Sequence, residues 1–228
     1  MAFRKKAGHI LSLSPDLVVI PECECVDRLK FSDGIKQPSS SLWFGTNLNK
    51  GLGIFSYNED IKLKVLKTHN PALRTIVPIS VTGSKYQFTL YAIWANNPDD
   101  PDGIYVEQIW KAIHHYDVHL KKKTSMLVGD FNSNIIWDRP RREGNHSSVV
   151  KFLEERKIFS SYHLHHKQLQ GKEEHPTLYM YRHKDKPYHI DYCFVSKDLA
   201  DNLHSVEIGD FDTWTTLSDH VPVIVTLK

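Results

Sequence analysis

The feature of this chain that most constrains its fold is a series of short β-forming runs separated by Asn, Gly and Pro residues. Several of the runs alternate apolar with polar residues, a period of two that is typical of strands with one buried face. Short connections between such strands favour antiparallel pairing. The expected strands in this part of the chain are residues 17–20, 41–46, 52–57, 61–67, 75–82 and 86–94.

Helical and β patterns are intermixed over the rest of the chain. Apolar residues at helical spacing predict a helix that begins near Phe3 and stops at Ser14-Pro15, and further helices at 103–120, at 147–156 and after Ser196. Strands are expected at 125–128, 177–182, 188–195 and 221–227, with a histidine-rich loop before the second of them. Because no repeat or linker divides the chain, we expect residues 1–228 to form a single α/β domain with two sheets flanked by helices.

The composition limits the partners that the chain can attract. Its 228 residues are 40% hydrophobic and 25% charged, which is a globular profile and excludes disorder. Lys and Arg number 29 and Asp and Glu 27, which leaves a formal net charge of +2. So small a charge excludes a strong field that would attract nucleic acid or anionic membranes regardless of sequence. Any contact with nucleic acid must therefore be local.

The cysteines and the start of the chain bear on its location. Cys23, Cys25 and Cys193 are an odd set, and the first two lie too close together to bridge comfortably, so a reduced setting fits best. The first residues are basic like those of a signal peptide, but polar residues interrupt the stretch after them. No run approaches the ~20 apolar residues that a membrane span needs. We expect a monomeric cytoplasmic protein without a membrane span.

Four segments carry polar residues at or near the ends of predicted strands. They are LVVIPE, SMLVGDFN, HIDY and SDHVPVIVTL, with the candidate residues Glu22, Asp130, Asn132, His189, Asp191, Asp219 and His220. Strand ends beside loops are where α/β scaffolds usually place reactive groups. Clustered carboxylates repel one another unless a cation lies among them, and their oxygens suit a hard ion such as Mg²⁺. The set therefore indicates metal-assisted phosphoryl transfer.

Each of these segments alone has an ordinary structural explanation as a turn, a cap or a buried partner. In this order, however, PE (21–22), GDFN (129–132), HIDY (189–192) and SDHVPV (218–223) resemble the endonuclease/exonuclease/phosphatase superfamily, the fold of deoxyribonuclease-like enzymes and exonuclease III. The resemblance covers nearly the whole chain. It implies a four-layer α/β sandwich with two mostly antiparallel central sheets, in agreement with the strand pattern.

The resemblance also implies roles in the in-line hydrolysis of a phosphoester. Asp130 would position or deprotonate the attacking water, and Asn132 would hold a non-bridging phosphate oxygen. Asp191 would orient His220, which contacts the scissile phosphate and stabilises its charge. Such a pairing is physically reasonable, because a carboxylate on one imidazole nitrogen fixes the tautomer and favours the charged ring.

The metal ligands that the resemblance implies are Glu22 and Asp219, and the implied ion is Mg²⁺ or Mn²⁺. Two features depart from the family pattern. Family members carry a strand that ends in an Asn before the first helix, whereas this chain starts in the helix. Trp94 stands near Asn96 where a Tyr or His that contacts phosphate is expected, and an indole donates one hydrogen bond but cannot shuttle a proton.

Several further residues are candidates on weaker grounds. Substrate contacts are assigned to Trp94, Asn96, Arg139, Arg141, Arg142 and His189, and the arginines fit a solvated turn equally well. A histidine-rich segment, with His163, His165, His166 and His175, has only weak zinc-ligand spacing.

The sequence leaves more than one function open. We expect a metal-dependent phosphoesterase, first of all an endo- or exonuclease that acts on DNA or RNA. The same fold also accommodates a phosphatase or phosphodiesterase for a lipid or a small-molecule phosphate. A weakly active or inactive binding module is the alternative from another class, and the substitution at Trp94 and the start of the chain in the helix support it.

Overall fold

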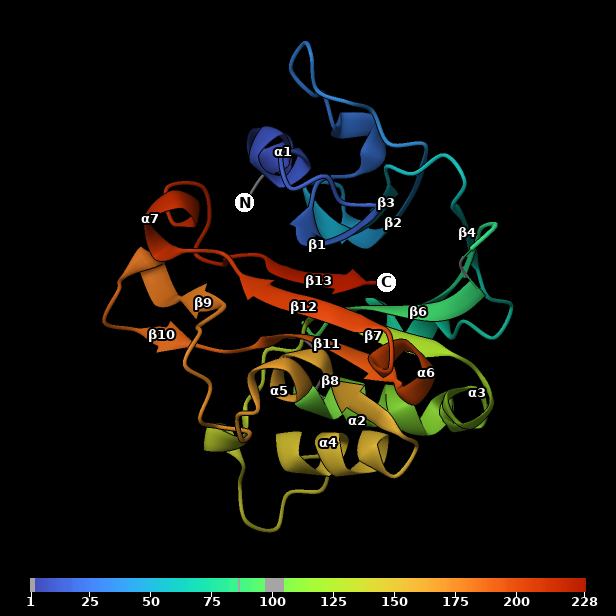
Figure 1. The fold of residues 1–228 in the computed structure, drawn as a ribbon, viewed down its shortest axis with the longest axis vertical. Coiled ribbons are helices and arrows are strands. Elements are labelled where there is room, and N and C mark those ends of the chain that lie inside the picture. The colour runs from blue at the N-terminus through green and yellow to red at the C-terminus, as the bar shows by residue number, and fades with distance from the viewer. Residues whose placement is uncertain (1–2, 86, 97–104) are drawn as a thin grey trace. The chain divides into compact units, whose positions relative to one another are not determined.

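The computed structural model describes residues 3–85, 87–96 and 105–228, which form two compact units, Met1–Trp94 and Ala95–Lys228 (Figure 1). The expected mixed α/β class, with mostly antiparallel sheets and flanking helices, is confirmed. The single domain expected from the sequence stays a prediction. Each unit contains both strands and helices.

The first unit contains one N-terminal helix and antiparallel strands. Its elements are α1 (Phe3–Leu11), β1 (Leu17–Cys23), η1 (Val26–Arg28), β2 (Ser40–Asn47), β3 (Lys50–Ser56), β4 (Lys62–Val65), η2 (Pro71–Leu73), β5 (Ile76–Thr82) and β6 (Gln87–Trp94). Strand β3 pairs with both β1 and β2, and β5 pairs with both β4 and β6. The β-forming runs of the sequence therefore predicted these strands, although residue 86 lies outside the described residues.

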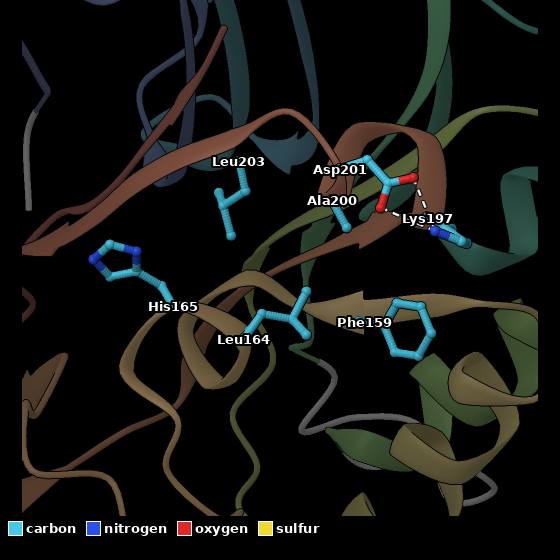
Figure 2. Close-up of a pocket in the computed structure, with 7 residues that line it drawn as sticks. All are labelled: Phe159, Leu164, His165, Lys197, Ala200, Asp201 and Leu203. Atoms are coloured by element: carbon cyan, nitrogen blue, oxygen red, sulfur yellow. Dashed lines mark hydrogen bonds and ion pairs between the residues drawn. The ribbon is translucent and has the colours of Figure 1, made fainter.

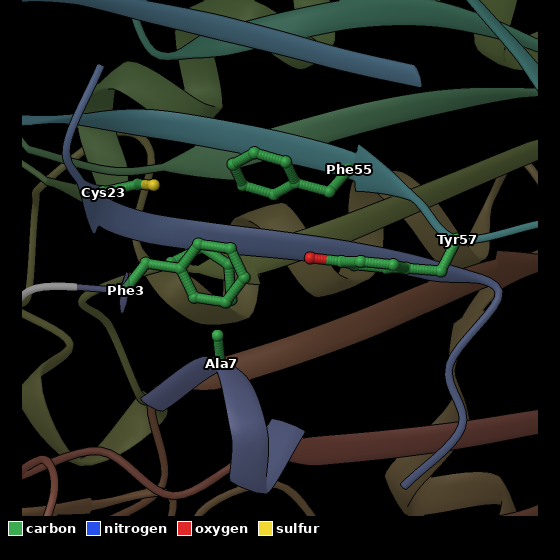
Figure 3. Packing of buried hydrophobic residues seen from close by; sticks show 6 residues of the cluster. Phe3, Ala7, Cys23, Phe55 and Tyr57 are labelled. Atoms are coloured by element: carbon green, nitrogen blue, oxygen red, sulfur yellow. The ribbon is translucent and has the colours of Figure 1, made fainter. Parts of the chain in front are cut away.

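The core of the first unit forms where α1 packs on the β1–β3 pair. Phe3 and Ala7 lie on one face of the helix, fully buried, and point towards Phe55 and Cys23 (Figure 3). The ring centroids of Phe3 and Phe55 are 4.9 Å apart. Burial of a phenylalanine side chain contributes about 2–3 kcal/mol. The Glu24 carboxylate accepts a hydrogen bond of 2.7 Å from the backbone N–H of Phe3, which suits a helix N-terminus.

The second unit intermixes helices and strands. Its elements are α2 (Val106–His115), α3 (Asp117–Lys122), β7 (Ser125–Asp130), η3 (Ile135–Trp137), α4 (His146–Glu154), β8 (Ile158–Ser160), α5 (Ser161–His166), β9 (Leu178–Tyr179), η4 (Met180–Arg182), β10 (Pro187–Tyr188), β11 (Asp191–Ser196), α6 (Lys197–Ala200), β12 (Leu203–Ile208), α7 (Phe211–Trp214) and β13 (Val223–Leu227). Strand β11 pairs antiparallel with β7 and β8, and β9–β10 and β12–β13 are further antiparallel pairs. Helices α2 and α4 pack together, and α4 contacts β8 (Figure 1).

Two boundaries expected in the second unit were wrong. The helix expected over 103–120 is broken at Tyr116, whose ψ of 9° leaves the helical range while its side chain is buried; residues 103–104 lie outside the described residues. The strand expected over 177–182 keeps only Leu178–Tyr179, because Tyr181 and Arg182 adopt φ values of +56° and +62° and turn the chain.

Four elements were missed, namely β8, α5, β12 and α7. Part of the expected histidine-rich loop is helix α5, since no Gly or Pro interrupts the chain between Lys157 and Gln170 and Tyr162 is buried. Strand β12 was missed because a register shift between Leu203 and Ser205 breaks the alternation that marks a strand. Among the described residues, no helix is both long enough and apolar enough to cross a membrane.

Candidate active site

Two carboxylates of the second unit come together because of the register of its central strands. Asp130 ends β7 and Asp191 begins β11, and the antiparallel register pairs these two residues directly. Gly129 has φ +140°, a backbone conformation that residues with a side chain rarely adopt, and it immediately precedes Asp130. Both carboxylates therefore lie at the same end of the strand pair, Asp130 buried and Asp191 half-buried.

Asn132 holds the Asp130 carboxylate in one orientation. Its backbone N–H donates to Asp130 Oδ1 and its side-chain Nδ2 donates to Oδ2, both at 2.8 Å. The same Nδ2 donates to the carbonyl of Ala95 at 3.0 Å. The backbone carries Asn132 through φ +45°, which Asn tolerates better than most residues. The Gly-Asp-Phe-Asn segment is thus a turn, and its polar side chains face each other rather than solvent.

His220 pairs with Asp191. Its Nδ1 atom is 2.9 Å from Asp191 Oδ2. Burial alone would lower the pKa of His220, but the Asp191 carboxylate, aided by Asp130 and Asp219, outweighs burial and raises the pKa to about 9. At neutral pH His220 is therefore an imidazolium whose Nδ1–H donates to Asp191, which leaves the Nε2–H as a donor. The contact of His220 with a scissile phosphate, which the sequence resemblance implies, stays a prediction.

Thr177 is a positioning residue that the sequence motifs missed. Its hydroxyl accepts hydrogen bonds of 3.0 Å from the backbone N–H groups of Ile190 and Asp191. Its carbonyl accepts from the backbone N–H of Val221 at 2.8 Å, so Thr177 ties the segment of Asp191 to that of His220. Thr177 is fully buried. A single buried Thr in a loop carries no sequence signal that distinguishes it from a turn residue.

The donor chemistry of this site is compatible with a divalent ion. One ligand atom from each of Asp130, Asp191 and His220 lies within 4.8 Å of the other two. The hydrogen bond and the opposite charges of Asp191 and His220 already explain that pair, and Asp130 adds oxygen atoms of the kind that divalent ions prefer. Asp219 is half-buried next to His220, and its carbonyl accepts from the backbone N–H of Tyr179 at 2.8 Å.

Glu22 lies in the first unit, on a bulge of β1. Ile20 pairs with Gly53 and Cys23 pairs with Gly51, so the register shifts across Pro21-Glu22. Proline has no N–H for the ladder, and Glu22 adopts φ +57°, a left-handed conformation that costs roughly 1–2 kcal/mol in a residue with a side chain. The carboxylate emerges half exposed, and its Oε1 is 2.8 Å from the Nζ of Lys50. A carboxylate that accepts an ammonium ion here has the charge and exposure to bind a metal cation.

The residues assigned to substrate on weaker grounds lie in varied surroundings. Trp94 ends β6, is 5% exposed, and its ring centroid is 5.5 Å from the Nζ of Lys50. Asn96 is half-buried and follows Ala95, whose N–H donates to the carbonyl of Asp130 at 2.8 Å. His189 is buried, with Nδ1 2.8 Å from the carbonyl of His175, and burial lowers its pKa. These assignments stay predictions.

The arginines after Gly-Asp-Phe-Asn lie in a loop that Asn145 closes. Asn145 Oδ1 accepts from the backbone N–H of Arg139 at 3.0 Å and from the Nε of Arg142 at 2.8 Å. Arg139 and Arg141 are exposed, and Arg142 is half-buried. Two of the three guanidinium groups are therefore turned to solvent, and their contact with substrate stays a prediction.

The histidines form a hydrogen-bonded network instead of a metal centre. His163 Nε2 is 3.0 Å from Glu173 Oε1, and its Nδ1 is 2.7 Å from Ser160 Oγ. Glu173 also accepts from the side chain of Asn134, which precedes η3. Burial would raise the pKa of Glu173, but these hydrogen bonds outweigh it and lower the pKa to about 2. Among the described residues, no three of these groups approach one another closely enough to hold a metal, so the zinc interpretation has no support.

A surface cavity of the second unit lies away from these residues. A shallow cavity of about 470 Å³ is lined by Phe159, Leu164, His165, Lys197, Ala200, Asp201 and Leu203 (Figure 2). Lys197 and Asp201 form an ion pair at its edge, while Leu164 and Phe159 form the apolar side. None of the residues predicted for the site lines this cavity.

Comparison with known proteins identifies the fold. No family model matches the chain, and no curated protein matches it in sequence. Among solved structures, the endonuclease domain of TRAS1, a telomere-specific non-LTR retrotransposon, has a TM-score of 0.64 at 16% identity, over 99% of this chain and 91% of that one.

Further structures agree with this match. A variant of the 3′ phosphatase NExo from Neisseria, bound to a product DNA hairpin, has a TM-score of 0.62 at 17% identity, over 100% of this chain and 96% of that one. An AP endonuclease from Archaeoglobus fulgidus has a TM-score of 0.61 at 16% identity, over 97% and 92% of the two chains. The chain therefore has the fold of the endonuclease/exonuclease/phosphatase proteins, as the resemblance of its motifs predicts.

Proposed function

We propose that this chain is a divalent-metal-dependent phosphoesterase that hydrolyses phosphodiester bonds in nucleic acid. The observation that supports the proposal most strongly is the Asp191–His220 pair, which lies beside an Asp130 carboxylate oriented by Asn132. Caps and surface ion pairs do not need three such groups within 4.8 Å of one another at one end of a strand pair. An enzyme that hydrolyses a phosphoester can use such groups to accept a proton from water and to stabilise the charge that develops on the phosphate.

In the proposed reaction each group has a separate task. Asp130 accepts a proton from the attacking water, and the two hydrogen bonds from Asn132 hold its carboxylate in place. As the water oxygen bonds to phosphorus, the bond from phosphorus to the leaving oxygen breaks, and the leaving oxygen takes its proton from solvent. His220 donates its Nε2–H to a non-bridging phosphate oxygen, whose negative charge grows in the transition state. Asp191 keeps His220 charged and oriented throughout.

The binding of a divalent metal ion is part of this proposal. Glu22 and Asp219 are the residues that we expect to hold Mg²⁺ or Mn²⁺, because their carboxylate oxygens are the ligands that these ions prefer. When bound, the ion neutralises phosphate charge and polarises the reacting phosphoryl group. Glu22 is half exposed and already accepts one cation, the ammonium of Lys50.

Nucleic acid is favoured over a lipid or a small phosphate ester by the segment next to His220. Leu178 of β9 forms a β-bridge with His220, so the β9–β10 hairpin borders the pair. Its tip carries Tyr181, which is 75% exposed, with the Nζ of Lys186 5.7 Å from its ring centroid. An exposed aromatic ring beside lysines is suited to stack on a base and attract a phosphate backbone. The names of the structural neighbours, which include nucleases, also favour this substrate.

The test is a substrate panel assayed with Mg²⁺, with Mn²⁺ and with excess chelator. It includes labelled single- and double-stranded DNA and RNA, a generic phosphodiester reporter, a phosphoinositide and sphingomyelin. The proposal predicts turnover of nucleic acid that requires metal. If only a lipid or a small ester is hydrolysed, the phosphoesterase chemistry holds but nucleic acid is not the substrate. A folded protein that binds nucleic acid and hydrolyses nothing supports the binding-module alternative.

A further inference from the structure

The ion pair between Lys50 and Glu22 joins two residues that the fold forces together. Lys50 opens β3 directly before Gly51, and Gly51 pairs with Cys23, the residue after Glu22. The bulge at Pro21-Glu22 then turns the Glu22 side chain towards the start of β3. The result is a distance of 2.8 Å between the Lys50 Nζ and Glu22 Oε1.

The local backbone is strained in a way that an ordinary surface ion pair does not require. Glu22 occupies the left-handed region at φ +57° in a strand whose neighbours are extended. An exposed ion pair stabilises a protein too little to favour such a conformation by itself. Strained residues cluster at functional sites, where the surrounding structure holds them. The strain therefore suggests that the position of the Glu22 carboxylate is selected for binding.

The Lys50 ammonium also lies near a second group of the same unit, the indole ring of Trp94. Its Nζ is 5.5 Å from the ring centroid of Trp94, a distance at which a cation is attracted to an indole face. Trp94 is itself nearly buried, so its ring is a fixed surface. Lys50 is half exposed and long enough to exchange between the carboxylate and the ring by rotation about its side-chain bonds.

We propose that Lys50 is an internal cation that a divalent metal ion must displace from Glu22, and that it sets the metal affinity of this chain. The inference rests on the proposed function only in assuming that Glu22 binds the ion. A metal ion on either carboxylate oxygen lies within a few ångströms of the ammonium, and the like charges repel. The ion therefore binds more weakly than it would to a free carboxylate, and its arrival moves the Lys50 ammonium towards Trp94. Lys50 is on this account a positioning residue, not a catalytic one.

The test measures Mn²⁺ binding by titration calorimetry on the full chain after treatment with chelator. Lys50→Met removes the charge and keeps the apolar stem, and we expect the Kd for Mn²⁺ to fall about tenfold. Lys50→Arg keeps the charge, and its Kd should stay within about threefold of the unmodified protein. Lys64→Met is the matched control, because Lys64 is an exposed lysine on β4 of the same unit and its loss changes the net charge equally.

A double-mutant cycle shows whether the effect passes through Glu22. In a Glu22→Gln background, the Lys50→Met substitution should leave the Mn²⁺ affinity unchanged. An unaltered or weaker affinity in Lys50→Met, or a gain that persists in the Glu22→Gln background, overturns the proposal. If Lys50→Met does not fold, Lys50→Gln takes its place with the same expectation.

The failure of this proposal is distinguishable from failure of the proposed function. If the protein hydrolyses its substrate only with metal but the Kd for Mn²⁺ is the same in Lys50→Met, the displacement proposal is wrong and the proposed phosphoesterase function is kept. If Lys50→Met raises the KM and leaves the Kd for Mn²⁺ unchanged, Lys50 binds the substrate and the displacement proposal is wrong. Absence of Mn²⁺ binding by every variant overturns both.

Discussion

The Nδ1 atom of His220 lies 2.9 Å from the Oδ2 atom of Asp191, and this pair is formed by residues 29 positions apart that two different β contacts bring together. Asp191 is fixed by its register with Asp130, and His220 by its bridge to Leu178. The pair therefore depends on the strand framework and not on either residue's local sequence.

Replacing Asp191 by Asn should reduce kcat about a hundredfold. The amide no longer provides the negative charge that raises the pKa of His220, so the imidazolium loses its stabilisation. The measurement is kcat at neutral pH on whichever nucleic acid the panel identifies. Asp201→Asn, which removes an exposed carboxylate paired only with Lys197 among the described contacts, is the control and should keep full activity. Equal activity of the Asp191→Asn and Asp201→Asn enzymes would mean that the pair is structural.

Replacing Asn132 by Gly should lower activity by about tenfold to a hundredfold, with a loss of stability that comes only from the two side-chain hydrogen bonds that it removes, to Asp130 and to Ala95. Glycine adopts the φ of +45° at this position readily, but it removes the side-chain hydrogen bond to Asp130 Oδ2. Asn132→Ala has the same chemical deficit and should also lose about 1 kcal/mol of unfolding free energy through backbone strain. Steady-state kinetics and urea unfolding separate the two effects. An active Asn132→Gly protein would show that Asp130 needs no orientation.

Replacing Thr177 by Val should destabilise the second unit by about 2–3 kcal/mol. The change leaves the buried N–H groups of Ile190 and Asp191 without their acceptor, at nearly the same side-chain volume. Thr177→Ser keeps the hydroxyl and should lose much less stability. Urea midpoints at neutral pH compare the three proteins. A Thr177→Val midpoint equal to that of the unmodified protein contradicts the role given to this hydroxyl.

Stability should fall as the pH is lowered from about 6.5 towards 4, because of His146. Burial lowers the pKa of this fully enclosed histidine from 6.5 to about 4. In that interval the unfolded chain binds a proton that the folded protein does not, so acid favours unfolding by up to about 3 kcal/mol. Urea unfolding at pH 7 and pH 4.5 measures the loss. His146→Gln should flatten this part of the profile, and an unchanged slope in that variant would assign the effect to other groups.

Features that depend on local sequence could be predicted, whereas features that depend on contacts between distant segments could not. The strands of the first unit were predictable because alternation and Gly, Asn or Pro turns are local signals. The roles of Asp130, Asn132, Asp191 and His220 could be hypothesised from motif order, and they stay predictions. The side-chain amide of Asn132, which was expected to hold a phosphate oxygen, donates instead to Asp130 and to the carbonyl of Ala95. The distances between these residues could not be predicted, since these depend on the register of β7 and β11.

Other features carried no local signal at all. The ammonium of Lys50 meets Glu22 only through the β1–β3 pairing and a bulge, 28 residues along the chain. Thr177 acts through its hydroxyl on backbone groups of a neighbouring segment, and any Ser or Thr in a loop looks the same in sequence. Helix α5 was hidden because histidines indicate neither a helix nor a loop strongly.

The measurement that tests the central claim most directly compares the unmodified chain with Asp130→Asn in a nucleic-acid hydrolysis assay, with Mg²⁺ and with excess chelator. The substitution keeps the size of the side chain and removes the proton acceptor that Asn132 orients. We predict Mg²⁺-dependent cleavage by the unmodified chain that chelator abolishes, and a loss of at least about a thousandfold in Asp130→Asn, in a protein that still unfolds in one cooperative transition. Cleavage that persists in Asp130→Asn, or that is indifferent to chelator, would contradict the account.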